Sequence, residues 1–168
     1  VDEETFTLNP ARLQDALDSA IKSAIEVVGI MSVGLFGQPA QMDKINSFAE
    51  ENGLWVLDDA AQSFGTEFRG AKTGTLAKAT CTSFFPAKPL GCYGDGGALF
   101  TNDLKIAEIA RSCRVHGQGT SKYQTVRLGM TARLDTIQAA ILLAKLDVFD
   151  KELQQRNAIA NYYHELLG

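Results

Sequence analysis

A lysine held between two prolines is the residue of this sequence best placed to do chemistry. Lys88 stands between Pro86 and Pro89, and a glycine-rich stretch at residues 94–97 follows shortly after. The prolines restrict the backbone and lack amide donors, so Lys88 cannot belong to a regular helix. Glycines allow sharp turns and a close approach of the backbone to a bound group. The pattern indicates an amine aimed at a ligand; the alternative interpretation is a solvated loop lysine.

The elements that must position this lysine alternate between helices and strands. Helices are predicted at residues 10–23, 39–51, 103–114, 134–149 and 151–167, and strands at 24–36, 54–57, 79–85 and 97–101. Asn9 and Pro10 are typical of a helix start. The stretch 24–36 is rich in Val, Ile, Met and Leu, which predicts a strand buried on both faces. The alternation predicts an α/β fold with a mostly parallel sheet and helices on both faces.

Composition and charge exclude several classes of protein. The 168 residues are 45% hydrophobic and 21% charged, which suits one globular unit with a core. A net charge of −4 argues against nucleic acid and anionic membranes as partners. No apolar run is long enough to span a bilayer, and residues 1–5 lack the features of a signal peptide. Three cysteines without CxxC spacing predict a reduced, cytoplasmic protein with no disulfide framework and no metal site.

Ligands of parallel sheets bind beyond the carboxyl ends of the strands. Asp58 and Asp59 end one predicted strand, Ser83 lies near the end of the next, and Lys88 follows it. A lysine amine can form a Schiff base with an aldehyde, and pyridoxal phosphate pairs such a lysine with a carboxylate that keeps its ring nitrogen protonated. Its phosphate needs hydroxyl and amide donors, which Ser83 could supply. The alternative is that the aspartates only cap the turn at residues 60–62 and that Ser83 is an ordinary strand residue.

Three motifs in the same order carry a resemblance to a known family. They are Asp58-Asp59-Ala60-Ala61-Gln62-Ser63-Phe64-Gly65, then residues 81–89, then residues 94–103, with 114–117 and 129–135 extending the match. Nearly the whole chain resembles the DegT/DnrJ/StrS family of pyridoxal-phosphate-dependent nucleotide-sugar aminotransferases of fold type I. Within the family, residues 85–97 are most similar to the enzymes that act on UDP-2-acetamido-3-oxo-glucuronate in bacterial surface-polysaccharide (O-antigen) synthesis.

The resemblance implies a role for each matching residue. Lys88 corresponds to the lysine that binds the cofactor covalently, and Asp59 to the partner of its pyridine nitrogen. Gln62 corresponds to the residue that contacts the phenolic oxygen, and Ser83 to a phosphate ligand. The amino donor of the family is most often glutamate, and the acceptor is a keto-sugar nucleotide.

Two further positions are implied to act across a homodimer with a shared active site. The family's asparagine that reaches the phosphate from the neighbouring subunit falls on Thr131, whose shorter side chain can donate one hydrogen bond. Arg133 matches an arginine that would help to hold an anionic substrate from across the dimer. The alternative for Arg133 is an ion pair at the core edge or the interface.

The resemblance also predicts which part of a family member this chain represents. Residues 1–150 correspond to the second half of the cofactor-binding large domain, and 151–168 to the start of the helix leading to a small domain. The family's Gly-Thr phosphate loop and ring-stacking residue would precede Val1, so we expect these 168 residues alone to hold the cofactor poorly. Two alternatives remain open: a related sugar dehydratase, in which histidine replaces the lysine, and a non-catalytic remnant that serves as a folding or assembly module.

Overall fold

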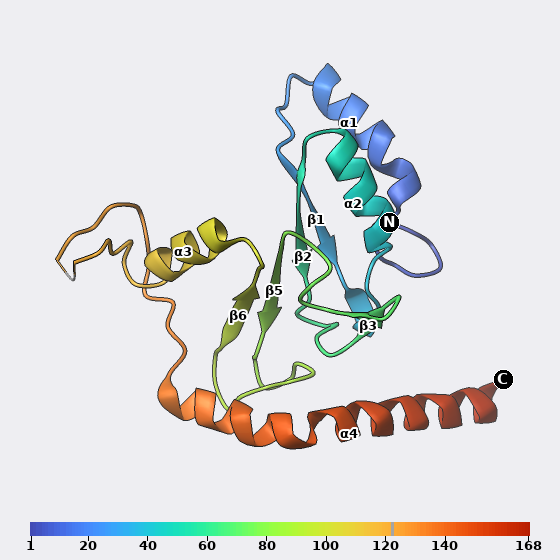
Figure 1. The fold of residues 1–168 in the computed structure, drawn as a ribbon. Helices are drawn as coiled ribbons and strands as arrows, with labels where there is room; N and C mark the ends of the chain where they lie inside the picture. Colours follow the sequence, from blue (N-terminus) through green and yellow to red (C-terminus); the bar gives the residue numbers. More distant parts are fainter. Residues whose placement is uncertain (122) are drawn as a thin grey trace.

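Four strands form one sheet at the centre of the molecule. The computed structural model describes residues 1–121 and 123–168. The strands β1 (Gly29–Val33), β2 (Trp55–Asp59), β5 (Ala79–Ser83) and β6 (Gly97–Phe100) lie in the order β1-β2-β5-β6. The first three run parallel, and β6 pairs antiparallel with β5 (Figure 1). The mostly parallel sheet predicted from the alternation of elements is therefore confirmed.

Helices cover one face of this sheet, and a third helix lies against part of the other face. A 3-10 turn, η1 (Pro10–Arg12), leads into α1 (Leu13–Lys22), and the Asn9 side chain accepts a hydrogen bond from the Ala11 amide, as the predicted helix start requires. α1 and α2 (Met42–Glu51) bury one face of the sheet in a core of Leu13, Ile30, Ala40, Met42, Ile45, Ala49, Val56 and Leu76. α3 (Leu104–Cys113) lies on the other face, where Ile106 shares an apolar pocket with residues of β2 and β5.

The longest helix, α4 (Thr136–Leu167), crosses the edge at which the parallel strands end (Figure 1). Its first half is anchored by Leu142 and Phe149, which pack with Phe84, Leu90 and Cys92. Beyond residue 150 nearly all of its side chains are exposed. The sequence predicted two helices here, and the structure has one continuous helix. The domain boundary proposed at residue 150 falls inside that helix.

The predicted strand at residues 24–36 is both shorter and less buried than expected. Only Gly29–Val33 pair with β2, because Ala24 takes a positive φ of 55° at the end of α1 and Phe36 takes 57° within the 3-10 turn η2 (Leu35–Gly37). The exposed fraction of Met31 is 57% and that of Val33 is 41%. The prediction of burial on both faces is wrong, since α1 and α2 cover only the face that carries Ile30 and Ser32.

Two features lie outside the main sheet. A small antiparallel hairpin, β3 (Glu67–Phe68) and β4 (Ala71–Lys72), turns at Arg69 and Gly70, both of which have positive φ. Between α3 and α4 an irregular loop projects from the body, with isolated bridges from Val115 to Thr131 and from Gln118 to Thr125 (Figure 1). Within the described part of the chain, no helix is both long and apolar enough to cross a membrane.

Candidate active site

Lys88 lies in the connection from β5 to β6, residues 84–96, which we call the lysine loop. The loop is closed at its base, because the carbonyl of Phe84 accepts a hydrogen bond from the Cys92 amide (2.8 Å). A second turn forms where the Lys88 amide donates to the Phe85 carbonyl (2.9 Å). No side chain of the described residues bonds to the Lys88 amine, so that amine is available to a ligand.

The neighbouring aspartates at the end of β2 point to opposite faces of the sheet. Asp58 is 2% exposed and accepts a hydrogen bond from the Ser32 hydroxyl (3.0 Å) on the face covered by α1 and α2. Asp59 is half-buried on the opposite face, and its Oδ1 accepts a hydrogen bond from the Ala61 amide (3.0 Å). Successive residues of a strand alternate between faces, which separates two otherwise identical carboxylates.

Asp59 shares its face with two residues of the adjacent strand. The register pairs Asp59 with Cys81, and Ser83 follows two positions along β5 on the same face. The Ser83 oxygen accepts a hydrogen bond from the Phe85 amide (3.2 Å), which leaves the hydroxyl proton free to be donated. A carboxylate and a hydroxyl therefore lie together at the carboxyl edge of two parallel strands, directly before the lysine loop.

Gln62 lies beside this group, in the turn that follows β2. Its Oε1 accepts a hydrogen bond from the Phe36 amide (3.4 Å), which ties the turn to the connection after β1. The Gln62 side chain is exposed, and its amide NH₂ has no partner among the described residues. That amide group can therefore donate to a bound ligand.

Thr131 and Arg133 lie apart from these residues, between the projecting loop and α4. Both are exposed, and Thr131 Oγ1 lies 3.2 Å from His116 Nε2. Within the part of the chain that the structure describes, no hydrogen bond or ion pair links either residue to Lys88, Asp59, Gln62 or Ser83. The structure thus places Asp59 and Ser83 on one face of the sheet, with Gln62 in the turn after β2 and Lys88 in the loop after β5, whereas Thr131 and Arg133 belong to a separate segment.

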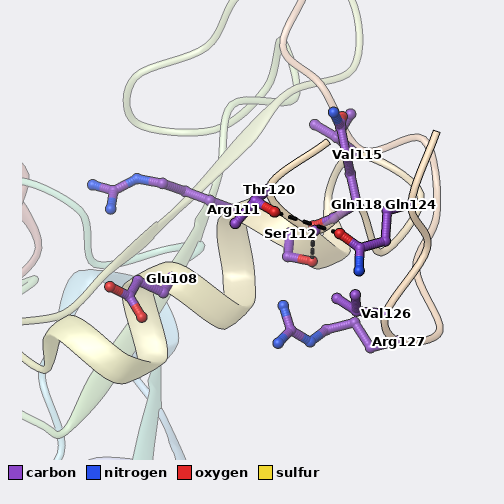
Figure 2. A pocket seen from close by; sticks show the side chains of 10 residues that line it. Glu108, Arg111, Ser112, Val115, Gln118, Thr120, Gln124, Val126 and Arg127 are labelled. Atoms are coloured by element: carbon purple, nitrogen blue, oxygen red, sulfur yellow. Dashed lines mark hydrogen bonds between the residues drawn. The ribbon is translucent and has the colours of Figure 1, made fainter. Parts of the chain in front are cut away.

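A hollow of the described surface lies away from this site. It has a volume of about 700 Å³ and lies between α3 and the loop at residues 115–127. Figure 2 shows Glu108 and Arg111 extending from the helix away from the loop, whereas Gln118 and Gln124 lie on the loop side. The polar groups do not converge on one point, so the hollow does not define a binding site.

Burial and neighbouring charge alter the titration of two groups near the site. Burial raises the pKa of Asp58, the Ser32 hydrogen bond opposes this rise, and the negative charge of Asp59 adds to it. Burial and the charges of Asp59 and Asp58 likewise raise the pKa of the Cys81 thiol. Cys81 therefore remains a neutral thiol beside Asp59 at neutral pH.

We expect Asp58→Asn to be more stable than the wild type at pH 7. The folded chain binds the Asp58 proton more tightly than the unfolded chain, so this contribution to stability is complete below the unfolded pKa and is lost as pH rises through the folded pKa. Asparagine keeps an oxygen acceptor for Ser32 without a charge. Urea unfolding between pH 3 and pH 8 checks this: the gain over wild type should grow with pH, and a gain independent of pH would contradict it.

Sequence reasoning missed two sets of residues at the site. The alternation of side chains along β5 would have placed Cys81 on the same face as Ser83. The sequence does not indicate, however, which face of the sheet the helices leave uncovered. Gln138 and Lys145 lie in the helix predicted at residues 134–149 and were not among the predicted site residues, yet both contact the lysine loop. Their spacing with Leu142 and Phe149, at positions 138, 142, 145 and 149, was the available signal of a single helix face.

Fold and site together define an α/β protein that presents a lysine amine and a carboxylate at the carboxyl edge of a mostly parallel sheet. The model of the DegT/DnrJ/EryC1/StrS aminotransferase family matches residues 1–168. The chain therefore belongs to this family, as its three motifs predicted.

Individual relatives agree with this assignment. UDP-2-acetamido-2-deoxy-3-oxo-D-glucuronate aminotransferase of Pseudomonas aeruginosa is 45% identical over 163 residues, 97% of this chain. The crystal structure of a DegT DnrJ EryC1 StrS aminotransferase from Brucella abortus is 45% identical, and its TM-score is 0.97 over 99% of this chain. NtdA from Bacillus subtilis, solved with bound cofactor PMP, has a TM-score of 0.77 at 27% identity and matches 89% of this chain.

These comparisons confirm the predicted fold class, part of the large domain of the fold type I pyridoxal-phosphate-dependent transferases. This chain spans 44% of the Pseudomonas aeruginosa relative, 45% of the Brucella abortus chain and 33% of NtdA. It thus covers less than half the length of each relative.

Proposed function

We propose that the protein carrying this chain is a pyridoxal-phosphate-dependent aminotransferase that moves an amino group from an amino acid to a keto-sugar nucleotide. One observation carries the proposal: Asp59 and Ser83 occupy one face of two adjacent parallel strands, and the unpartnered amine of Lys88 follows directly in the next loop. Membership of an aminotransferase family supports it. The 45% identity to the Pseudomonas aeruginosa UDP-2-acetamido-2-deoxy-3-oxo-D-glucuronate aminotransferase favours a UDP-linked 3-oxo sugar acid as the acceptor.

The residues present fit pyridoxal phosphate. The ligand has an aldehyde, a basic ring nitrogen, a phenolic oxygen and a phosphate, which call for an amine, a carboxylate, an amide donor and a hydroxyl donor. Lys88, Asp59, Gln62 and Ser83 supply these four groups, each with the required hydrogen-bonding capacity free. When bound, pyridoxal phosphate supplies a protonated ring that accepts the electron pair released at the carbon of the amino donor.

Lys88 and Asp59 carry the chemistry in this proposal. The Lys88 amine would hold the cofactor through a covalent bond to its aldehyde carbon. Once freed, the same amine would act as general base and general acid for the proton on the carbon of the amino donor. The Asp59 carboxylate would accept a hydrogen bond from the ring nitrogen and stabilise its positive charge, and the Ala61 amide, which donates to Asp59 Oδ1, holds that carboxylate in place.

Gln62 would orient the cofactor through its phenolic oxygen, and Ser83 would do so through its phosphate. Thr131 and Arg133 would act in the site of the second subunit of a homodimer, which agrees with their exposure and their separation from Lys88 in one chain. Thr131 would donate to the phosphate, and Arg133 would bind an anionic substrate. The proposal also includes this shared site, glutamate as the amino donor and a cytoplasmic setting. It further divides the chain into part of the cofactor-binding large domain (residues 1–150) and the start of a linking helix (residues 151–168).

Keto-acid formation tests this function. The protein, with pyridoxal phosphate and L-glutamate alone, should release one equivalent of 2-oxoglutarate per site and then stop. Adding a UDP-linked 3-oxo sugar should restart the release, with the amino sugar formed in equal amount. If glutamate released no 2-oxoglutarate while another amino acid released its keto acid, only the donor would be wrong. If no amino acid reacted in cofactor-loaded protein, the proposed function would be wrong.

A further inference from the structure

We propose that Lys145 and Gln138 of α4 are positioning residues that hold the lysine loop and thereby aim Lys88. Lys145 Nζ donates a hydrogen bond to the Gly91 carbonyl (2.5 Å) and lies 4.8 Å from the centroid of the Tyr93 ring. Gln138 Oε1 accepts a hydrogen bond from the Tyr93 amide (2.8 Å). The inference rests on the proposed function, because it assigns a purpose to the conformation of the Lys88 segment.

The contacts of Lys145 are made at the base of the loop. A Cβ atom on Gly91 would lie 2.5 Å from the Pro86 carbonyl oxygen, so the chain closes tightly between the residue two before Lys88 and the residue three after it. The neighbours of Gly91, Leu90 and Cys92, are 3% and 0% exposed. A rigid base leaves Lys88 at the tip of a short closed segment, and a contact that orients the base also orients the lysine.

α4 presents these two polar groups on either side of a buried anchor. Leu142 lies between Gln138 and Lys145 on the same helix face and packs into the cluster that contains Leu90 and Cys92. Leu142 fixes the distance between helix and loop, and the two polar side chains fix the rotation of the loop about that contact. Hydrogen bonds are directional, whereas apolar contact is not, so the polar pair supplies the orientation.

The Lys145 ammonium is suited to this task. A charged donor binds a carbonyl more strongly than a neutral one, and the partly buried setting of the Gly91 carbonyl limits competition from water. The Tyr93 ring adds a cation–π contact that holds the ammonium over the loop. Gln138 also packs closely against Gly94, where an added Cβ atom would lie 3.2 Å from Gln138 Nε2.

Borohydride trapping of pyridoxal phosphate on Lys88 tests the proposal without relying on turnover. We expect Lys145→Met to attach the cofactor about tenfold more slowly than wild type, as the loss of one charged hydrogen bond predicts. Lys151→Met makes the same change on the exposed part of α4 and should match wild type. Lys145→Arg keeps a donor and a cation and should recover most of the rate.

A loop-side pair of variants separates positioning from folding. Tyr93→Leu removes the ring, whereas Tyr93→Phe keeps it, so only the former should slow attachment. In the double variant Lys145→Met/Tyr93→Leu the two losses should be less than additive, because both act through one contact. Circular dichroism establishes that each variant is folded. Equal rates for wild type and Lys145→Met would overturn the inference, while absence of labelling in wild type would instead refute the proposed function.

Discussion

Replacing Lys88 with alanine is expected to abolish covalent attachment of pyridoxal phosphate and to lower kcat by at least roughly 1,000-fold. One residue supplies both the covalent anchor and the general base, and a positioned base alone contributes about 100- to 10,000-fold. The fold should be retained, because the Lys88 side chain makes no hydrogen bond or ion pair to the rest of the described chain. Borohydride reduction followed by peptide mass spectrometry measures the attachment, and steady-state assays measure the rate.

Lys105→Ala is the matched control for this variant. Lys105 lies exposed on α3, on a different element from the site, and its loss should change neither labelling nor rate. Labelling of the Lys88→Ala protein to the wild-type extent would show that another lysine holds the cofactor. The assignment of Lys88 would then be wrong, even if the protein remained an aminotransferase.

The second large effect is expected from Asp59→Asn, which should lower kcat by about 100-fold while leaving the KM for the amino donor within a few-fold of wild type. An asparagine cannot stabilise a positive charge on the ring nitrogen, so electrons released at the donor carbon are accepted less readily. Asparagine keeps the oxygen that accepts from the Ala61 amide, so the turn after β2 should persist. The absorbance spectrum of the bound cofactor gives a second readout, because it responds to protonation of the ring.

Asp58→Asn provides the comparison within the same pair of residues. Its carboxylate bonds to Ser32 beneath α1 and α2, on the face opposite Asp59. Activity should therefore stay near the wild-type value in Asp58→Asn. If Asp58→Asn lost activity and Asp59→Asn kept it, the two residues would have to exchange roles.

Local chemistry predicted most of the elements. Asn9 and Pro10 begin a helix because an N-cap oxygen and a fixed proline φ act within one turn. The Asp103 side chain caps α3 in the same way, through the amides of Lys105 and Ile106. By contrast, the strand predicted at 24–36 was too long, because Ala24 closes the end of α1 with a positive φ and a local hydrogen bond to the Ile21 carbonyl, and alanine is not a residue that usually marks such a turn.

The candidate site was predictable as a set of chemical groups but not as an arrangement. Residue types and order named an amine, a carboxylate, an amide and a hydroxyl, and family motifs assigned them to Lys88, Asp59, Gln62 and Ser83. The contact between Lys145 and the Gly91 carbonyl joins residues 54 positions apart. No local pattern marks such a contact, because it depends on where α4 crosses the sheet.

The amino-acid sequence by itself determined the family, the mostly parallel sheet and the segment that carries Lys88, because turn chemistry, periodicity and motif order are all local properties of the chain. Only the tertiary structure decided that Asp58 is covered and Asp59 faces the site, since two adjacent strand residues differ only in which face the helices bury. It also decided that α4 holds the lysine loop. Both outcomes depend on packing between elements that are distant in the sequence, and no single segment of the sequence encodes that packing.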